Sequence, residues 1–124
     1  MSLNKIMLIG RCTAPNIRDL ESGKLATFSL ATTDRYKDRA GEWKEDTTWH
    51  NIVAYGNTAG VVEKYVQKGS QIYIEGKLRN RKYTDLDGVE RSVTEVLVSS
   101  MEILDRRQQN GGGSQSNQGY NDSF

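Results

Sequence analysis

Cations and an aromatic ring recur at every second position near residue 80, and together they could recognise a nucleic acid. Lys77, Arg79, Arg81 and Tyr83 fall at alternate positions, and alternate residues of a strand point to the same side. The opposite face, which includes Leu78, is expected to be core. Cations attract phosphates, and exposed rings stack on bases. The spacing therefore predicts a face that binds single-stranded nucleic acid.

A second segment presents two rings in the same way. Trp49 and Tyr55 are six residues apart, which corresponds to about 20 Å along a strand and leaves room for several unstacked bases. Stacking tolerates any sequence because every base has a π-face. The bases of a duplex are already stacked on one another, so we expect a preference for single strands and none for sequence.

For each ring taken singly, packing against the protein is the alternative to base stacking, because aromatic residues also favour half-buried strand positions. A single cation is likewise explained as part of a solvated strand face. The coincidence of rings and cations favours binding. His50 lies on the face opposite Trp49, so we expect a structural histidine there.

Catalysis has no comparable set of residues. Cys12 is the only cysteine and His50 the only histidine, and the chain has no P-loop, nucleophile elbow or metal-ligand spacing. The 16 acidic residues are scattered among 17 Lys and Arg, which nominates no general acid and base. We expect no enzyme activity, no metal and no cofactor, with Cys12 a partly buried strand residue.

The cysteine count fits a reducing compartment, and the hydropathy pattern leads us to expect a soluble cytosolic protein. A lone cysteine cannot form an internal disulfide. No stretch approaches the roughly 20 apolar residues of a membrane span, and the first residues show no signal or transit pattern. The net charge of +1 does not itself indicate a nucleic-acid binder, so that inference rests on where the charges lie.

Strands are needed to position these faces, and the pattern predicts five. Short apolar runs with period-two alternation, bounded by Gly and Asp, are typical of strands. Turn-forming residues at 21–23, 39–41 and 85–88 separate some of them. The predicted strands are Lys5–Arg11, Leu25–Thr33, Thr48–Tyr55, Ser70–Tyr83 and Ser92–Leu104.

One segment has helical spacing instead. Apolar residues at intervals of three and four predict a helix over 58–68, with Thr58 as its N-cap and Gly69 as its stop. Three strands, one helix and two strands in this order favour an all-β fold. The architecture expected is a five-stranded OB-fold Greek-key barrel with one short helix between the third and fourth strands.

The composition changes after Arg107. Residues 108–124 are almost all Gly, Gln, Asn and Ser, and such a segment cannot bury enough apolar surface to offset its ordering entropy. We therefore predict a folded domain over 1–107 and a disordered C-terminal tail over 108–124.

Several segments resemble bacterial single-stranded DNA-binding proteins, the SSB family. The most specific is the run Ile72–Tyr83, followed by Asp87-Gly88 and Thr94-Glu95-Val96. Similar stretches occur at Asn4–Arg11, Phe28–Thr32, Thr48–His50 and Tyr65–Ser70. The motifs follow one another in the family's order and cover about residues 3–104.

The resemblance implies an OB barrel that usually assembles as a homotetramer, with single-stranded DNA wrapped over several subunits. Such a protein protects DNA during replication, recombination and repair, and it works in the cytoplasm at the nucleoid. The family's stacking positions fall on Tyr36, Trp49, Tyr55 and Tyr83. Its basic contacts fall on Lys5, Arg11, Arg18, Lys37, Lys68, Lys77, Arg79, Arg81 and Lys82. The position of His50 is associated with the subunit interface.

The chain departs from the family pattern inside the barrel. Tyr36 and Tyr83 stand where members commonly have Trp, and Tyr still stacks with a smaller ring. Asn51 and Asn57 stand where basic residues are frequent. Both changes remove a phosphate partner, so we expect a shallower salt dependence of binding than in a typical member.

The C-terminal tip departs further. The family usually ends in an acidic tip closed by Pro-Phe, which recruits replication and repair enzymes. This chain keeps Asp122 and the terminal Phe124 without the Pro, so the recruitment of such proteins is an open expectation. An accessory protein that bridges a helicase or its loader, and an RNA chaperone of the cold-shock kind, stay open as alternatives. No residues are dedicated to reading a 2′-hydroxyl.

Overall fold

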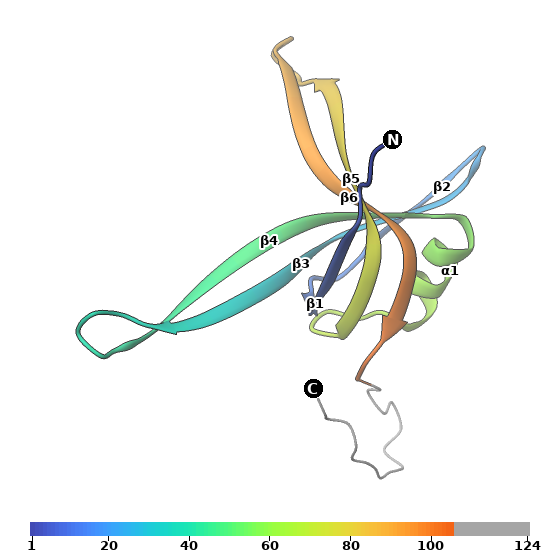
Figure 1. Cartoon of the computed structure of the whole chain (residues 1–124). Coiled ribbons are helices and arrows are strands. Elements are labelled where there is room, and N and C mark those ends of the chain that lie inside the picture. The colour runs from blue at the N-terminus through green and yellow to red at the C-terminus, as the bar shows by residue number, and fades with distance from the viewer. Residues whose placement is uncertain (106–124) are drawn as a thin grey trace, which may run out of the picture.

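One sheet, antiparallel except for the parallel pairing of β4 with β6, curls round and closes on itself in the computed structural model, which describes residues 1–105 (Figure 1). Its strand order is β1-β5-β6-β4-β3-β2, and an additional pairing of β1 with β3 completes the barrel. The elements are β1 (Ile6–Cys12), β2 (Asn16–Leu20), β3 (Gly23–Lys37), β4 (Trp43–Tyr55), α1 (Gly56–Tyr65), β5 (Gln71–Thr84) and β6 (Glu90–Ile103). The predicted OB barrel, with its one short helix before β5, is confirmed.

Alternating apolar side chains fill the barrel. Leu30, Ile52, Ile72 and Ile74 are at most 1% exposed, and each is flanked on its strand by more exposed residues that point outward. The helix α1 contributes Ala59 and Val62 to the same core. Burial of these side chains, at about 25 cal/mol per Å² of apolar surface, is the main stabilising term.

Two glycines let neighbouring strands approach closely, one where β1 closes the barrel on β3 and one between β5 and β6. Gly10 lies beside β3, and a Cβ built on it would be 2.1 Å from the carbonyl oxygen of Ala31. A Cβ on Gly76 would be 2.2 Å from the carbonyl oxygen of Leu97. Neither position tolerates a side chain without movement of the neighbouring strand.

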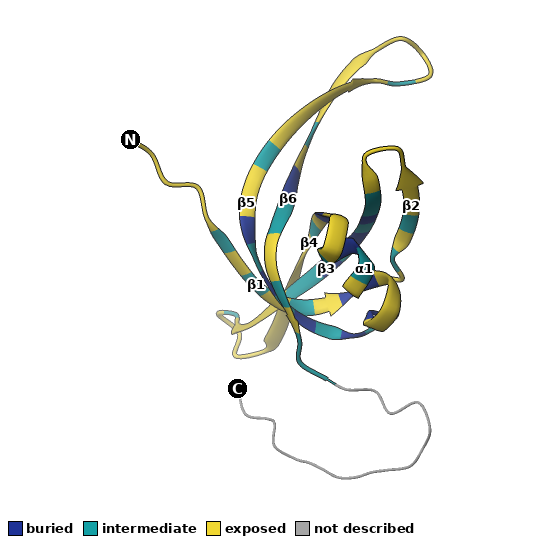
Figure 2. Cartoon of the chain, turned by 90° about the vertical axis from the view of Figure 1, so that its right-hand side faces the viewer, coloured by how far each residue is buried: buried dark blue, intermediate teal, exposed yellow. Residues whose placement is uncertain are grey.

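Two long hairpins leave the barrel as arms. The far parts of β3 and β4 form one, and those of β5 and β6 form the other (Figures 1 and 2). The pairing of β5 with β6 shifts register between Glu75 and Gly76, where the second arm begins. Leu78 lies just beyond this shift and is 45% exposed. The prediction that Leu78 is core is therefore wrong, because its strand has already left the barrel.

Local boundaries differ from the sequence prediction in two further respects. Residues 16–20 form β2, which extends the sheet by a hairpin with β3 and was not predicted. The helix begins at Gly56, with Tyr55 as its N-cap and no side-chain capping bond, and ends at Tyr65. Thr58 is thus inside the helix. Gly69 has a φ of +87° and lies in the turn that follows.

The predicted tail and domain boundary at 107/108, with Asp122 and Phe124, lie outside the described residues. Within residues 1–105, no helix is long and apolar enough to cross a membrane.

Candidate nucleic-acid interface

A buried carboxylate joins two arginines and two rings at the base of the β5–β6 arm. Glu95 is 3% exposed and lies directly opposite Arg79 in the strand register. The Nε of Arg79 donates to Glu95 Oε2 at 3.1 Å, and the Nε of Arg81 donates to the same oxygen at 3.3 Å. The guanidinium of Arg79 is 5.9 Å from the ring centroid of Tyr55, and that of Arg81 is 5.8 Å from the ring of Tyr83.

Electrostatics favour the charged forms of Glu95 and Arg79. Burial opposes the charge of Glu95, but hydrogen bonds from Arg79 and then Arg81 outweigh it, so the pKa of Glu95 lies below its ordinary value. Hydrogen bonds to Tyr55 and Glu95 raise the pKa of Arg79. The three groups therefore carry a net charge of +1 while both guanidiniums are held beside aromatic rings.

A shallow hollow connects this cluster to the outer face of β3 and β4. Its lining residues are Thr27, Phe28, Ser29, Asn51, Ile52, Val53, Arg81, Val93 and Glu95. Trp49 is two residues from Asn51 on β4, on the same face, and is 60% exposed. The ring of Trp49 therefore extends the cationic, aromatic surface along β4.

The strand register also brings Arg18 to this face. Arg18 pairs with Leu25, and Leu25 pairs with Tyr55. Directly opposed residues of antiparallel strands share a face of the sheet. The structure thus places Arg18, Tyr55, Trp49, Arg79, Arg81 and Tyr83 along one outer surface, which we call the aromatic–cationic face.

Two predicted residues point to the other side of their hairpins. Tyr36 pairs with Lys44, which places its exposed ring on the face of the β3–β4 arm opposite Trp49. Lys82 pairs with Ser92, opposite the side of Arg81. Alternation within β5 already implies the position of Lys82, whereas that of Tyr36 relative to Trp49 depends on how β3 is aligned with β4.

Trp43, an aromatic residue of the charged segment Asp34–Glu45, is an exposed ring that is not among the four predicted stacking positions. It pairs with Lys37 and lies on the same face of β4 as Trp49. Trp43 is 60% exposed, and the side chain of Lys37 approaches to 5.5 Å from its ring centroid. An even spacing of six residues from Trp49 was the signal in the sequence that could have identified it.

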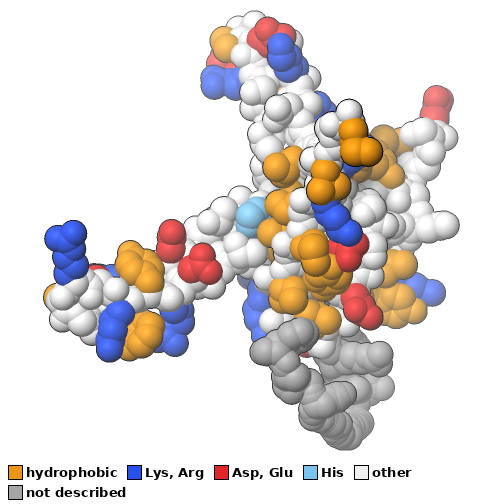
Figure 3. Space-filling view, in the orientation of Figure 1, with side chains coloured by type: hydrophobic (Ala, Val, Ile, Leu, Met, Phe, Trp, Pro, Cys, Tyr) orange, Lys and Arg blue, Asp and Glu red, His pale blue; other side chains and the backbone are white. Residues whose placement is uncertain are grey.

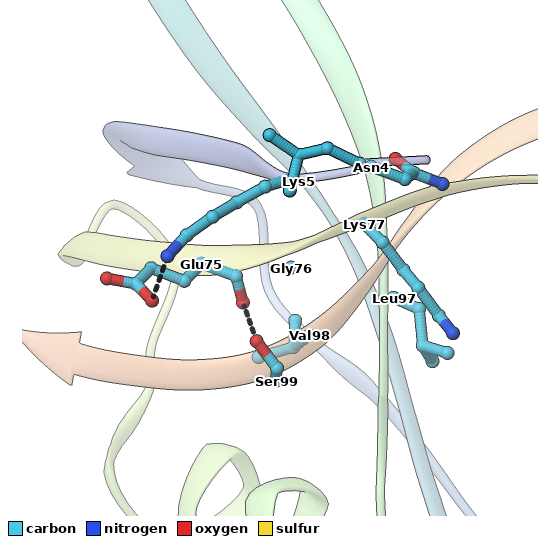
Figure 4. A pocket seen from close by; sticks show the side chains of 9 residues that line it. Asn4, Lys5, Glu75, Gly76, Lys77, Leu97, Val98 and Ser99 are labelled. Carbon is cyan, nitrogen blue, oxygen red and sulfur yellow. Dashed lines mark hydrogen bonds and ion pairs between the residues drawn. The ribbon is translucent and has the colours of Figure 1, made fainter. Parts of the chain in front are cut away.

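Lys5 and Lys77 line a second hollow, where β5 turns outward at Gly76 (Figure 4). The ammonium of Lys5 is 3.4 Å from the carboxylate of Glu75. Lys77 points away from that pair in the close-up view and is exposed. Asn4 anchors the N-terminal segment here, since its side chain exchanges two hydrogen bonds with the backbone of Leu78.

Arg11 and Lys68 lie near the turn after α1. Arg11 pairs with Ala31, which pairs with Trp49, so Arg11 lies on the same outer side of the sheet as Trp49. Arg11 Nη1 donates to the carbonyl of Gly69 at 2.9 Å and pairs with Asp105 at 3.1 Å. Lys68 is exposed in that turn. The predicted basic residues are therefore not all on one surface, since Lys82 points to the other side of its arm and Lys68 lies in the turn after α1.

His50 and Cys12 have structural surroundings. His50 is half-buried on the face opposite Trp49, and its Nε2 is 2.9 Å from the Oγ1 of Thr32. Cys12 is 5% exposed, and burial raises the pKa of its thiol, which keeps it protonated at neutral pH. Within residues 1–105, no group of three His, Cys, Asp or Glu is placed to hold a metal ion.

An OB barrel with exposed rings and cations along its outer face defines a class of nucleic-acid-binding domains. The pattern of the Single-strand binding protein family matches residues 3–104, and the chain belongs to this family. The resemblance noted in the sequence is therefore confirmed, and proteins of this family act by binding rather than by catalysis.

Relatives and solved structures agree with this assignment. The chain is 39% identical over 122 residues to a single-stranded DNA-binding protein of Neisseria meningitidis serogroup B, covering 97% of this chain and 70% of the relative. It is 45% identical over 112 residues to single-stranded DNA-binding protein 1 of Xylella fastidiosa, covering 88% and 82%. The solved Plasmodium falciparum SSB in complex with ssDNA superposes with a TM-score of 0.76 at 41% identity, covering 85% of this chain and 97% of that one.

Proposed function

We propose that this protein binds single-stranded DNA without sequence preference and protects it during replication, recombination and repair. The observation that carries this proposal is the aromatic–cationic face, where Tyr55 and Tyr83 remain 45% and 42% exposed beside the guanidiniums of Arg79 and Arg81. Exposed rings at these positions are available to bases, and the cations lie where the neighbouring phosphates would pass.

Binding proceeds by two separable interactions. Bases stack on Trp49, Tyr55 and Tyr83, at a cost on alanine substitution of about 1–3 kcal/mol each, a magnitude measured on proteins of this kind. Phosphates approach Arg18, Lys77, Arg79 and Arg81 and release counterions, which makes affinity fall with salt. Duplex DNA offers no free base faces, so the rings discriminate against it.

The remaining predicted residues contact the DNA if the DNA strand passes around the barrel. Their positions on several surfaces favour a wrapped path rather than a straight groove. These residues are Tyr36, Lys37 and Lys82 on the arms, Lys5 beside Glu75, and Arg11 and Lys68 near the turn after α1.

The protein acts as a homotetramer with His50 at a subunit interface. Support comes from the half-buried imidazole bound to Thr32 and from β1, whose outward-facing Met7 and Ile9 are 60% and 41% exposed. Within residues 1–105, only Arg11 and Cys12 of β1 pair with β3, so in this part of the chain Ile6–Gly10 present an unpaired edge on that side. Such an edge, flanked by apolar side chains, favours association of copies.

Asp122 and Phe124 form the C-terminal contact for replication and repair proteins, and the protein works in the cytoplasm at the nucleoid. This part of the proposal is supported by an acidic and an aromatic residue two positions apart in the sequence, Asp122 and Phe124.

A titration with oligo-dT tests the function. Tryptophan fluorescence is followed at two or more salt concentrations, with duplex DNA and oligo-U as competitors. We expect strong quenching that duplex DNA does not reverse, with a salt slope that counts the phosphates engaged. Weak quenching, or equal competition by duplex, would contradict the proposal and favour an accessory protein whose main partners are proteins.

A further inference from the structure

The far end of the β3–β4 arm carries an indole that packing does not explain. Every residue from Thr33 to Thr47 is exposed apart from the half-buried Asp38, so the arm has no core to receive a ring. Trp43 is 60% exposed, and hydrophobic and basic side chains gather around this end of the arm in the space-filling view (Figure 3). A large apolar ring kept in solvent at this position points to a binding role.

Two cations accompany this ring. The guanidinium carbon of Arg35 is 5.2 Å from the centroid of Trp43, and the ammonium of Lys37 is 5.5 Å away. Both residues are on the strand opposite Trp43, at positions that share its face. Cation–π contacts orient the ring, yet they leave more than half of the side chain exposed.

We propose that Trp43, with Arg35 and Lys37, is a further stacking site for a base of single-stranded DNA. This proposal rests on the function proposed above. Trp43 and Trp49 are six residues apart on the same face of β4, which corresponds to about 20 Å. A DNA strand with one base stacked on Trp49 that continues along the arm therefore reaches Trp43 after several unstacked nucleotides.

The surface between the two tryptophans is compatible with such a path. It carries the pair Thr33 and Thr47, whose hydroxyls hydrogen-bond at 3.0 Å, and the pair Arg35 and Glu45 at 4.0 Å. Neutral hydroxyls and a paired carboxylate present no unbalanced negative charge to the phosphates.

The charges of the arm separate by face. Lys44 lies on the face opposite Trp43 and is 3.8 Å from both Asp38 and Glu42. Within residues 1–105, Lys37 is in no ion pair, and Arg35 has only the long contact with Glu45. The face of Trp43 therefore keeps an excess of positive charge, which suits a phosphate beside a stacked base.

The chain's two tryptophans allow each site to be observed alone. In Trp49→Phe the only indole is Trp43, and in Trp43→Phe it is Trp49, while phenylalanine keeps a ring at the altered position. Full-length variants are titrated with oligo-dT over the range of about 4–16 nucleotides that an OB fold occupies. We expect every length to quench Trp49, and only the longer lengths to quench Trp43.

Affinities measured with labelled oligo-dT provide the second readout. Trp43→Ala should weaken binding of the longer oligonucleotides roughly 5- to 150-fold, the range of one lost stack, and leave the shortest unchanged. Trp43→Phe, the matched control, should keep most of the affinity. Arg35→Gln and Lys37→Gln should each flatten the logarithmic salt slope by about 0.7, the value of one phosphate on a single strand, whereas Trp43→Ala should not.

The outcomes separate this proposal from the general function. Quenching of Trp49 without any quenching of Trp43 at every length would overturn the Trp43 site and leave single-strand binding intact. The absence of quenching in both variants would overturn single-strand binding itself. A changed number of subunits in Trp43→Ala, measured by sedimentation, would assign the ring to a subunit contact and also overturn the site.

Discussion

Glu95 lies directly across the β5–β6 ladder from Arg79 and accepts its Nε–H at 3.1 Å while only 3% exposed. A buried carboxylate in the middle of a face proposed to bind a polyanion opposes the phosphates electrostatically. Its compensating effect is geometric, because it also binds Arg81 and so holds both guanidiniums beside Tyr55 and Tyr83. We interpret Glu95 as the group that orders the cations before DNA arrives.

The free energy of unfolding should depend less on pH in the acidic range in Glu95→Gln than in the wild type. The pKa of Glu95 is lowered on folding, since the bonds from Arg79 and Arg81 outweigh the effect of burial. A carboxyl of this kind stabilises the native state above its unfolded pKa of about 4.3, and the stabilisation is lost as pH falls through the lower, folded pKa. The variant should therefore lose about 1–3 kcal/mol at pH 7, with a smaller difference below about pH 4.

Denaturant unfolding of both proteins across this pH range measures the effect. Glu90→Gln is the control, because Glu90 is an exposed carboxylate on the same strand. A difference between wild type and Glu95→Gln that stays constant with pH would contradict the charged role of Glu95.

Arg79→Ala should weaken binding to single-stranded DNA and flatten its salt dependence. The substitution removes a cation from the aromatic–cationic face and leaves Glu95 with Arg81 alone. The logarithmic slope of affinity for oligo-dT against salt is the measurement. Lys64→Ala removes the same charge from α1, where Lys64 is exposed, and should leave the slope almost unchanged. Equal slopes for wild type and Arg79→Ala would show that Arg79 does not meet a phosphate.

The barrel was predictable from the sequence because much of its strand sequence alternates between core and solvent, although Ile52, Val53 and Ala54 of β4 are all buried. Ile72 and Ile74 show this alternation and are fully buried. The arms and β2 were harder to predict, since hydrophobic periodicity reports burial and these segments are solvated on both sides. Ile17 is the one residue of β2 that is not exposed, which is too little for a pattern. Leu78 was misplaced because alternation continues through the point where the strand leaves the core.

The site was predictable strand by strand but not across strands. Alternation correctly placed Trp49 opposite His50, since both lie on one strand. The relation of Tyr36 to Trp49 depends on the pairing of β3 with β4, which no spacing within either strand encodes. Glu95 escaped prediction for the same reason. It looks like an ordinary polar strand residue until the register brings Arg79 and Arg81 to it.

Trp49→Ala should weaken binding to single strands of every base composition to a similar extent. The lost interaction is stacking, which is worth about 1–3 kcal/mol, or roughly 5- to 150-fold in affinity. Binding to oligo-dT, oligo-dA and mixed sequences is compared, with Trp49→Phe as the control that keeps a ring. A loss confined to one base would indicate hydrogen-bonded readout instead of stacking.

Gly10→Ala should destabilise the barrel, whereas Gly60→Ala should not. A Cβ at position 10 would be 2.1 Å from the backbone oxygen of Ala31, and a backbone atom can yield only if β3 moves away from β1. We expect a loss of about 1–3 kcal/mol or more in the free energy of unfolding. A Cβ on Gly60, inside α1, would meet no atom within 4 Å beyond its own turn of helix backbone, and alanine should stabilise the helix by about 0.5–1 kcal/mol. Chemical unfolding of both variants tests the pair, and equal stability of Gly10→Ala and wild type would show that β1 and β3 are not held at this distance in solution.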